Sequence, residues 1–403
     1  MPTLNETPSA NRLHIAIYGR RNAGKSSLIN ALTDQPVALV SDVPGTTTDP
    51  VRKAMEVRGL GACMLIDTAG FDDEGELGAL RVQKTGETIS KADIALLLCA
   101  GEDLSLERQW SRKLKAAGVK QLAIISKADA GDTATLAEAV QRELGMQPFI
   151  VSAKTRQGIP ALLAALTRVL PENDAAPSIL GGLAKAGDTV LLVMPQDSEA
   201  PKGRLILPQV QTIRELLDSG CVSINVTPDS MDAALAALKK PPALIITDSQ
   251  VFDNVYQKTP QGSRLTSFSV LYAAHKGDLS VFLEGAQALD RLTENSHVLI
   301  AEACTHAPLS EDIGREKIPA MLRKKFGTGL QIDVVSGTNF PDTLDGYDLI
   351  IHCGGCMLNE REMKYRLRMA VDQNIPMTNY GVAIAYMTGI LERSVRPFIT
   401  LIS

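Results

Sequence analysis

Residues 19–26 combine the residue types that bind phosphate. They read Gly-Arg-Arg-Asn-Ala-Gly-Lys-Ser, follow an apolar run and precede a stretch with helical periodicity. This is the context that the G-x-x-x-x-G-K-[ST] phosphate loop requires. Its glycines let backbone N–H groups turn towards the phosphates, and a helix amino terminus favours negative charge there. We expect Lys25 to neutralise the β and γ phosphates and Ser26 to coordinate Mg²⁺.

Two further segments carry residues that complete a nucleoside triphosphate site. Asp67-Thr-Ala-Gly70 follows an apolar run, so the Asp67 carboxylate is expected to reach Mg²⁺ and the Gly70 amide the γ phosphate. Thr46 and Thr47 lie between the two motifs, after a Pro-Gly turn. A hydroxyl there, expected from Thr47, can close over Mg²⁺ when the third phosphate is present. On their own, the threonines would equally describe an ordinary polar loop.

A base-recognition element follows two later apolar runs. Asp129 can accept two hydrogen bonds from the N1 and N2 donors of guanine, which adenine lacks, and Lys127 precedes it. Ser152, Ala153 and Lys154 end the next run and are expected to support the base. The sequence therefore predicts a GTP-binding site, with Lys25, Asp67 and Gly70 as its catalytic residues. The predicted nucleotide-binding residues are Gly19, Asn22, Ala23, Gly24, Lys25, Ser26, Ser27, Thr46, Thr47, Asp67, Gly70, Lys127, Asp129, Ser152, Ala153 and Lys154.

A second group of residues suited to chemistry lies near the other end of the chain. Cys304 and His306 are separated by 45 residues from His352, which is followed by Cys353-Gly-Gly-Cys356. Both halves come at the ends of apolar runs. In an open parallel sheet, ligands collect outside the carboxyl ends of the strands, so the two halves are expected to converge. The two glycines would let both thiolates of the second half face one metal.

The residue types leave several interpretations of this group open. Three thiolates and a histidine suit tetrahedral zinc, and three thiolates with one exchangeable position suit an iron–sulfur cluster. A thioredoxin-like redox pair at Cys353 and Cys356 leaves the other residues unexplained. The residues could also be unrelated and never meet. Strand alternation adds Glu302, which would share a side with Cys304 and His306 if the strand persists that far.

The elements that must position these residues have the pattern of an α/β protein. Short apolar β-rich runs alternate with amphipathic stretches, as in parallel sheets covered by helices. Two or three domains are expected for 403 residues. We predict a P-loop domain over 1–170, a linker over 171–178, a small α/β domain over 179–260 and an α/β metal-cluster domain over 261–403. Expected strands include 13–18, 94–99 and 349–352, and expected helices include 25–32 and 359–373.

Composition excludes several classes of protein. The net charge of −5 argues against non-specific nucleic-acid binding, which needs a basic surface. No apolar run is long enough to span a membrane, and the amino terminus has no signal-peptide pattern, so a cytoplasmic location is expected. Cys63, Cys99 and Cys221 lie singly in apolar runs and are expected to be buried.

Residues 10–170, through the motifs above, resemble the GTPase branch that contains the tRNA-modification GTPase and the Era-like proteins. Two positions depart from the family patterns. Ser126 stands where this branch has an asparagine that ties the base-recognition element to the phosphate loop, which implies weaker guanine binding. Phe71 stands where Ras-like enzymes have the glutamine that orients water, which implies slow hydrolysis. The resemblance also implies that Asn22 helps to hold a potassium ion in place of an arginine finger.

The whole chain resembles the FeFe-hydrogenase maturation GTPases, the HydF family, because a GTPase precedes C-x-H, a long gap and H-C-x-x-C. The resemblance implies that Cys304, Cys353 and Cys356 hold a 4Fe-4S cluster whose fourth ligand is weak or exchangeable. His306 and His352 match the family motif as candidates for that ligand, and Glu302 is our own addition.

The family likeness also implies a role and partners. The protein would be a scaffold and carrier that receives a di-iron subcluster precursor from radical-SAM maturation enzymes and delivers it to apo FeFe-hydrogenase. The domain at 179–260 would make a homodimer, and neither nucleic acid nor a membrane would be a partner. One alternative is a GTP-regulated zinc protein that binds a ribosome or RNA, and another is a redox enzyme that uses Cys353 and Cys356.

Overall fold

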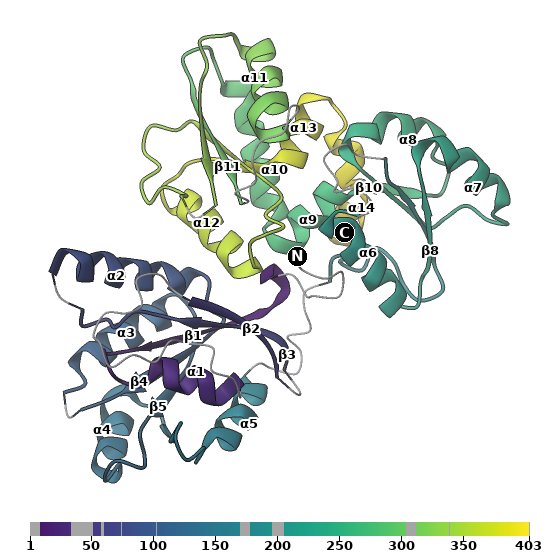
Figure 1. Ribbon diagram of the computed structural model, residues 1–403. Helices are drawn as coiled ribbons and strands as arrows, with labels where there is room; N and C mark the ends of the chain where they lie inside the picture. Colours follow the sequence, from purple (N-terminus) through teal and green to yellow (C-terminus); the bar gives the residue numbers. More distant parts are fainter. Residues whose placement is uncertain are drawn as a thin grey trace. The chain divides into compact units, whose positions relative to one another are not determined.

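The chain folds into two compact units, Met1–Asp174 and Ala175–Ser403, drawn in Figure 1. The computed structural model describes residues 9–33, 51–57, 60–73, 75–101, 103–169, 178–195, 205–303, 312–337 and 339–402. Parallel sheets covered by helices make up both units, which confirms the α/β class. Within these ranges, no helix combines the length and the apolar character needed to cross a bilayer.

The amino-terminal unit is built on a six-stranded sheet of order β2-β3-β1-β4-β5-β6 within its described residues. All its pairings are parallel except the hairpin of β2 and β3. Every residue of β4 is buried, because helices cover both faces of the sheet. The elements are β1 (Leu13–Gly19), α1 (Lys25–Thr33), β2 (Val51–Val57), β3 (Gly61–Asp67), α2 (Gly75–Glu87), β4 (Ile94–Cys99), α3 (Ser105–Ala116), β5 (Lys120–Ile125), α4 (Ala134–Leu144), β6 (Phe149–Ile150) and α5 (Ile159–Val169).

Two apolar clusters hold this sheet between its helices. On one face, Leu28 of α1 and Leu162 of α5 pack against the central strands. On the other, Trp110 of α3 and Val140 of α4 do so. The parallel order brings the carboxyl ends of β1, β3 and β5 to one edge. The segments that follow those strands therefore meet there, although they are far apart in the sequence.

The carboxy-terminal unit contains two four-stranded parallel sheets, of order β10-β9-β7-β8 and β12-β11-β13-β14. The strands are β7 (Thr189–Val193), β8 (Val222–Val226), β9 (Leu244–Thr247), β10 (Arg264–Ser267), β11 (His297–Glu302), β12 (Gln331–Ser336), β13 (Leu349–His352) and β14 (Met377–Asn379). The helices are α6 (Leu207–Asp218), α7 (Met231–Ala237), α8 (Phe252–Lys258), α9 (Phe268–Lys276), α10 (Leu279–Gln287), α11 (Ile318–Phe326), α12 (Glu360–Asp372), α13 (Tyr380–Met387) and α14 (Leu391–Ile402).

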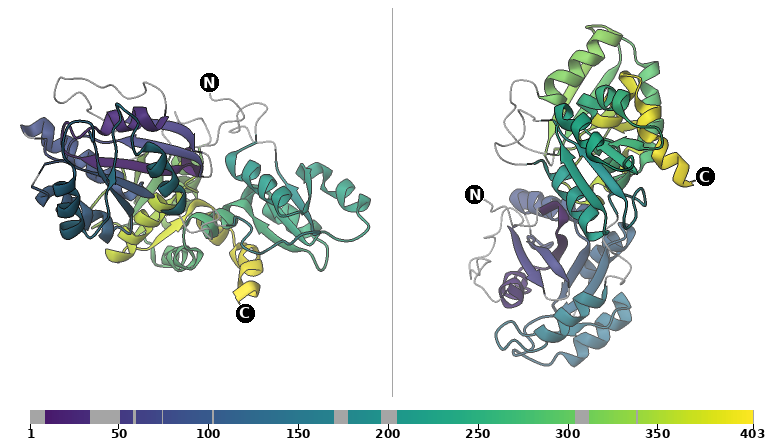
Figure 2. Two further views of the ribbon diagram at one scale, coloured as in Figure 1. Left: turned by 90° about the horizontal axis from the view of Figure 1, so that it is seen from below. Right: turned by 90° about the vertical axis from the view of Figure 1, so that its right-hand side faces the viewer.

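The first of these sheets extends past the predicted domain boundary at residue 260. Strand β10 begins at Arg264 and pairs with β9. The last helix, α14, packs against this sheet. Thr266 Oγ1 of β10 donates a hydrogen bond of 2.8 Å to the carbonyl of Ser394 on α14. In both views of Figure 2 the end of α14, marked C, projects from the unit.

The two sheets share a helix, which explains why they form one compact unit. Leu271 of α9 belongs to the apolar cluster over the first sheet, and Ala273 of the same helix belongs to the cluster of the second. The division into a middle and a carboxy-terminal domain therefore stays a prediction. The three cysteines expected to be buried, Cys63, Cys99 and Cys221, are buried.

Candidate functional site

The phosphate loop joins β1 to α1 and needs glycine at both of its ends. A Cβ on Gly19 would lie 2.9 Å from Leu98 Cβ, and Gly24 has φ of 93°. Lys25 is buried, and its Nζ donates to the carbonyls of Gly19 (3.0 Å) and Arg20 (2.8 Å). Burial lowers the pKa of Lys25, and the Asp67 charge opposes that shift. The loop thus folds around its own lysine, which is the cation expected at the phosphates.

Ser26 and Asp67 form a site of the kind that holds Mg²⁺. Ser26 Oγ donates to Asp67 Oδ2 at 2.6 Å, and Asp67 is 2% exposed. Burial raises the pKa of Asp67, although the Ser26 hydrogen bond opposes that change. The other oxygen, Oδ1, is buried and has no hydrogen-bond partner among the described residues. Because a buried carboxylate oxygen without a partner is costly, a divalent cation fits this position.

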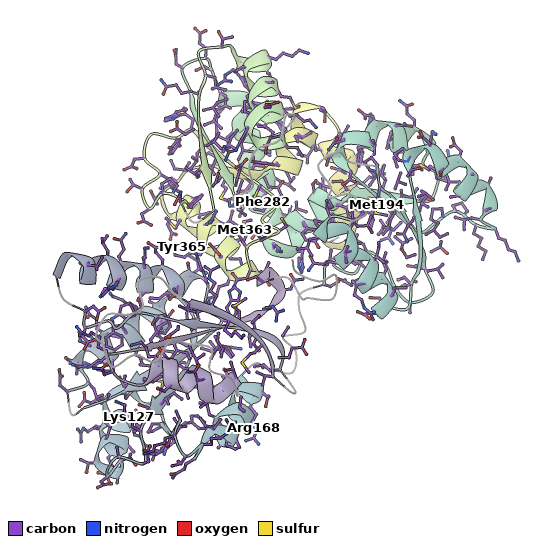
Figure 3. All side chains as sticks on the ribbon, viewed as in Figure 1. Lys127, Arg168, Met194, Phe282, Met363 and Tyr365 are labelled. Atoms are coloured by element: carbon purple, nitrogen blue, oxygen red, sulfur yellow. The ribbon has the colours of Figure 1, made fainter. Side chains whose placement is uncertain are left out.

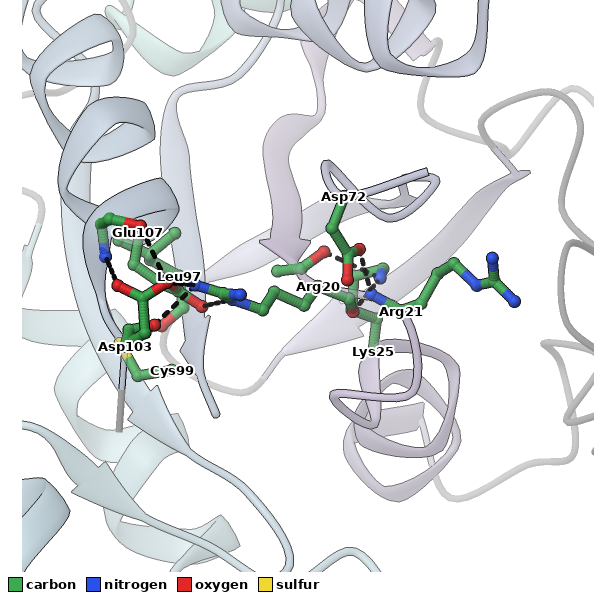
Figure 4. Close-up of polar contacts among 10 residues, drawn as sticks. Arg20, Arg21, Lys25, Asp72, Leu97, Cys99, Asp103 and Glu107 are labelled. Carbon is green, nitrogen blue, oxygen red and sulfur yellow. Dashed lines mark hydrogen bonds and ion pairs between the residues drawn. The ribbon is translucent and has the colours of Figure 1, made fainter. Parts of the chain in front are cut away.

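The segment after Asp67 lies against the phosphate loop. A Cβ on Gly70 would lie 2.7 Å from Arg21 Cγ. Two residues on, Asp72 Oδ1 accepts a hydrogen bond of 2.6 Å from the backbone N–H of Arg21, shown in Figure 4. The Asp72 carboxylate therefore accepts a hydrogen bond from a backbone N–H of the loop that is expected to bind phosphate. The sequence analysis missed Asp72, and its only signal was an acidic residue close to the Asp67–Gly70 motif.

Arg20 anchors the loop on its other side, where Figure 4 shows it directed away from Arg21. Its Nε and Nη2 donate to the two carboxylate oxygens of Glu107 at 2.9 and 3.1 Å. Glu107, on α3, is fully buried. The bonds to Glu107 raise the pKa of Arg20. Neither residue was expected from the sequence, because nothing local marks the two as partners.

The base-recognition residues connect to the phosphate loop and to each other. Ser126 Oγ donates to the Ala23 carbonyl in a short hydrogen bond, so the hydroxyl makes the tie expected of asparagine in the relatives. Lys127 Nζ, labelled in Figure 3, donates to the Asn22 carbonyl at 2.7 Å. The base-recognition element is therefore bonded to the phosphate loop at two points, and the weaker guanine binding expected from Ser126 stays a prediction.

Asp129 is held in place by a buried serine. Ser152 Oγ donates to Asp129 Oδ1 at 2.6 Å, and this bond lowers the pKa of the carboxyl. Asp129 is exposed, while Ala153 and Lys154 continue the same loop at the edge of the sheet. The structure thus gathers the described nucleotide residues at one sheet edge. Thr46 and Thr47 lie outside the described residues.

The cysteine loop follows β13 at the carboxyl end of its sheet. Cys353 Sγ accepts hydrogen bonds from the backbone N–H of Ala303 (3.0 Å) and Gly355 (3.4 Å). Ala303 follows β11, the neighbouring strand. The sulfur therefore lies between the ends of the two strands that the sequence expected to converge. Cys304 and His306 lie outside the described residues, within which no group of three candidate ligands occurs.

The remaining two fourth-ligand candidates have other partners. Glu302 Oε2 accepts from Arg315 Nη2 at 3.0 Å and from Ser336 Oγ at 3.1 Å. His352 is fully buried, and burial lowers its pKa to about 3. Its Nδ1 donates to the Cys353 carbonyl at 2.7 Å, while Nε2 accepts from Arg366 at 3.0 Å. Ligation by His352 requires the release of one of its bonds, because both ring nitrogens are engaged.

Three family models match the chain in tandem. "50S ribosome-binding GTPase" matches residues 14–127, "Hydrogen maturase F dimerization domain" matches 179–277 and "Hydrogen maturase F tetramerization domain" matches 280–397. The amino-terminal unit is thus a GTPase domain.

Curated relatives include two tRNA modification GTPases. The protein from Heliobacterium modesticaldum is 30% identical over 55% of this chain and 45% of its own length. The protein from Lactobacillus delbrueckii subsp. bulgaricus is 34% identical over 40% of this chain and 34% of its own. The chain spans less than half the length of either relative. Among solved structures, Era in complex with MgGDPNP and a segment of 16S ribosomal RNA is 17% identical, with a TM-score of 0.36, over 53% of this chain and 92% of that one.

Proposed function

This chain belongs to the hydrogen maturase F family of GTPases, and we propose that it is a scaffold and carrier in the maturation of FeFe-hydrogenase. It binds and hydrolyses GTP, holds a 4Fe-4S cluster, receives a di-iron subcluster precursor and delivers it to the apo enzyme. The observation that carries this proposal is the Cys353 sulfur between the ends of β11 and β13, in a chain whose other unit is a GTPase domain.

The nucleotide site supports slow hydrolysis. On GTP binding, the Lys25 ammonium would move from the loop carbonyls to the β and γ phosphates, and Ser26, Thr47 and Asp67 would hold Mg²⁺. Asp129 and Ser152 select guanine. Phe71, which stands where glutamine orients water in faster enzymes, is buried with its ring stacked on Trp110 at 5.5 Å. No polar side chain is therefore supplied from that position.

A potassium ion held with help from Asn22 is the proposed substitute for an arginine finger. Asn22 has φ of 56°, a left-handed conformation that asparagine tolerates. Its carbonyl accepts from Lys127, so the residue is fixed within the loop. We expect GTP hydrolysis to be faster in K⁺ than in Na⁺, and an Asn22→Ala variant to lose that difference. Equal rates of the wild-type protein in both salts would refute potassium stimulation.

The cysteine loop fits an iron–sulfur cluster in its donor chemistry. Cys353 and Cys356 supply thiolates, and Cys304, one residue after Ala303, would supply the third. Two backbone N–H groups already point at the Cys353 sulfur, as suits an anionic ligand whose hydrogen bonds tune a cluster. When bound, the cluster supplies an iron site with an exchangeable ligand. The candidates for that ligand remain Glu302, His306 and His352. Of these, His352 would first have to release one of its two hydrogen bonds.

The nucleotide would act by changing affinities for partners. GTP can shift a conformational equilibrium only through different affinities for its two states. The proposed partners are radical-SAM maturation enzymes and the immature hydrogenase, in the cytoplasm, without nucleic acid or membrane. The matched dimerization and tetramerization domains support oligomerisation, and we propose a homodimer.

The test is anaerobic reconstitution with iron and sulfide, followed by metal analysis and electron paramagnetic resonance of the reduced protein. Wild type is compared with Cys304→Ala, Cys353→Ala and Cys356→Ala. Cys221→Ala is the matched control, since Cys221 is buried in the same unit away from the loop. About four irons per chain, lost in the three variants and kept in the control, is the expected result. Iron content that survives all three substitutions would refute the cluster assignment.

A second candidate is a GTP-regulated zinc protein that binds a ribosome or RNA. The observation in its favour is the ribosome-binding GTPase model that matches residues 14–127. The net charge of −5 of this chain argues against RNA binding, which needs a basic surface. One tightly held zinc without sulfide in anaerobically purified protein would establish this alternative. Activity that survives the loss of Cys304 would instead favour a redox pair at Cys353 and Cys356.

A further inference from the structure

A buried lysine lies beneath the cysteine loop. Lys276, the last residue of α9, is 2% exposed. Its Nζ donates to three carbonyls of the loop and its continuation, those of Gly355 (3.1 Å), Cys356 (3.4 Å) and Leu358 (2.9 Å). An ammonium group removed from water therefore contacts the backbone on both sides of Cys356.

This ammonium group has no carboxylate partner within the described parts of the chain. The nearby Glu360 instead pairs with Lys364 on α12. By contrast, the second buried cation of this region, Arg366, pairs with Glu362 at 3.3 Å. A buried charge normally needs a partner of opposite sign, because burial removes its hydration. An anionic group bound at the cysteine loop would supply this missing counter-ion.

Lys276 Nζ contacts the carbonyl of Cys356 itself and that of Gly355, so the loop that carries both thiols is adjacent to the ammonium group. Burial lowers the pKa of Lys276 to about 8, and the Cys356 and Cys353 charges oppose the shift more than Glu360 does. Thiolates, or an anionic group bound to them, would thus supply the missing negative charge.

The loop is also held from its other side, so its distance from Lys276 is constrained. Gly355 has φ of 63°, and a Cβ there would lie 2.3 Å from Met363 Cε. Met363, labelled in Figure 3, is buried on α12. The loop backbone at Gly355 thus packs closely against Met363 and is hydrogen-bonded to the Lys276 ammonium group.

We propose that Lys276 is the buried counter-charge of the anionic group held at Cys353 and Cys356, and that it raises the reduction potential of a cluster bound there. This inference rests on the proposed function. Three thiolates around a 4Fe-4S core of charge 2+ leave a net charge of −1, and one-electron reduction makes it −2. A nearby positive charge stabilises the more negative, reduced form, and it does so strongly where water is excluded.

A purely structural lysine would make a different prediction. If Lys276 only satisfies the three carbonyls, a neutral donor of similar length can replace it. Lys276→Gln keeps an N–H donor and removes the charge, whereas Lys276→Arg keeps the charge. The matched control is Lys364→Gln, which removes a charge from an exposed lysine of the same region, 54% exposed and screened by water.

The experiment is a potentiometric titration of the full-length reconstituted protein, followed by electron paramagnetic resonance. We expect Lys276→Gln to hold the wild-type amount of iron and sulfide with a midpoint potential shifted to a more negative value. Lys276→Arg and Lys364→Gln should stay close to wild type. Loss of the cluster from the Gln variant alone would also support the counter-charge, since the Arg variant keeps the shape and the charge.

Two results would overturn the inference. One is a full cluster of unchanged potential in Lys276→Gln, and the other is equal loss of the cluster from the Gln and Arg variants. Either would reduce Lys276 to a structural role and leave the proposed function intact. A wild-type protein that binds no cluster would instead overturn the proposed function, together with this inference.

Discussion

Removal of Arg20 from its ion pair with Glu107 should measurably destabilise the GTPase domain. Arg20→Ala leaves the Glu107 carboxylate fully buried without its cation. Breaking a buried pair by removing one partner costs about 3–5 kcal/mol. The Arg20 side chain is 23% exposed, so water can partly replace it, and we expect about 3 kcal/mol. Glu107→Gln should cost less, because the charge it leaves is that of Arg20, which is partly exposed and also pairs with Asp103 at 3.3 Å.

The chain contains a natural reporter for this measurement. Trp110 is its single tryptophan, and it lies on α3 in the amino-terminal unit, stacked on Tyr18 and Phe71. Its fluorescence during urea denaturation of the full chain therefore follows that unit alone. With a denaturant slope of about 2 kcal/mol per molar, the expected loss corresponds to a midpoint lower by about 1.5 M urea.

Arg142→Ala is the control, since Arg142 is 73% exposed and pairs with its sequence neighbour Glu143 at 3.6 Å. Its midpoint should equal that of wild type. A loss in Arg20→Ala of less than about 1 kcal/mol, the range of exposed pairs, would refute the reasoning. Equal destabilisation by Glu107→Gln and Arg20→Ala would also refute it, because the loss of stability would then not come from the buried, unpaired Glu107 carboxylate.

Three other outcomes are expected. Ser126→Ala should weaken GTP binding about fivefold, because it removes one hydrogen bond worth about 1 kcal/mol, and Ser126→Asn should restore the affinity. Unchanged binding of GTP to the Ala variant in calorimetry would show that the hydrogen bond to the Ala23 carbonyl does not contribute to affinity. Asp72→Ala should tighten GTP binding about tenfold, since the carboxylate no longer competes with phosphate for the Arg21 amide; weaker binding in the same assay would contradict that competition. Val222 is 53% exposed on β8, an edge strand of its sheet as described, within the range that the dimerization domain model matches. We propose it as a dimer contact, so Val222→Lys should yield monomers in analytical ultracentrifugation, and an unchanged sedimentation coefficient would place the interface elsewhere.

Local pattern was enough to predict the parts of the site that are contiguous in the chain. The phosphate loop needs a strand, glycines and a helix in immediate succession, and β1 and α1 supply them. Asp67 and Cys353 were predicted from their places at the ends of apolar runs, because a buried strand must end where its polar residues begin. Burial of the lone cysteines followed from the same argument.

The contacts between residues far apart in the sequence could not be predicted from local pattern. Ser126 meets Ala23 across 103 residues, and Arg20 meets Glu107 across 87. Strand β10 and helix α14 are joined by a hydrogen bond between residues 128 positions apart in the sequence. Periodicity shows that a segment is a strand or a helix, but it does not give the order of strands in a sheet.

Lys276 shows most clearly the difference between what the sequence predicts and what the tertiary structure decides. In the sequence it is a lysine at the end of an apolar helix, where a positive charge near the helix carboxyl terminus is ordinary. Only the packing of α9 beneath the loop at Gly355 buries it. The sequence by itself determined where a phosphate loop is expected and which thiols lie at a strand end, since these depend on neighbours in the chain. The tertiary structure decided which charges surround them, because strand order and helix packing bring remote segments within hydrogen-bonding distance.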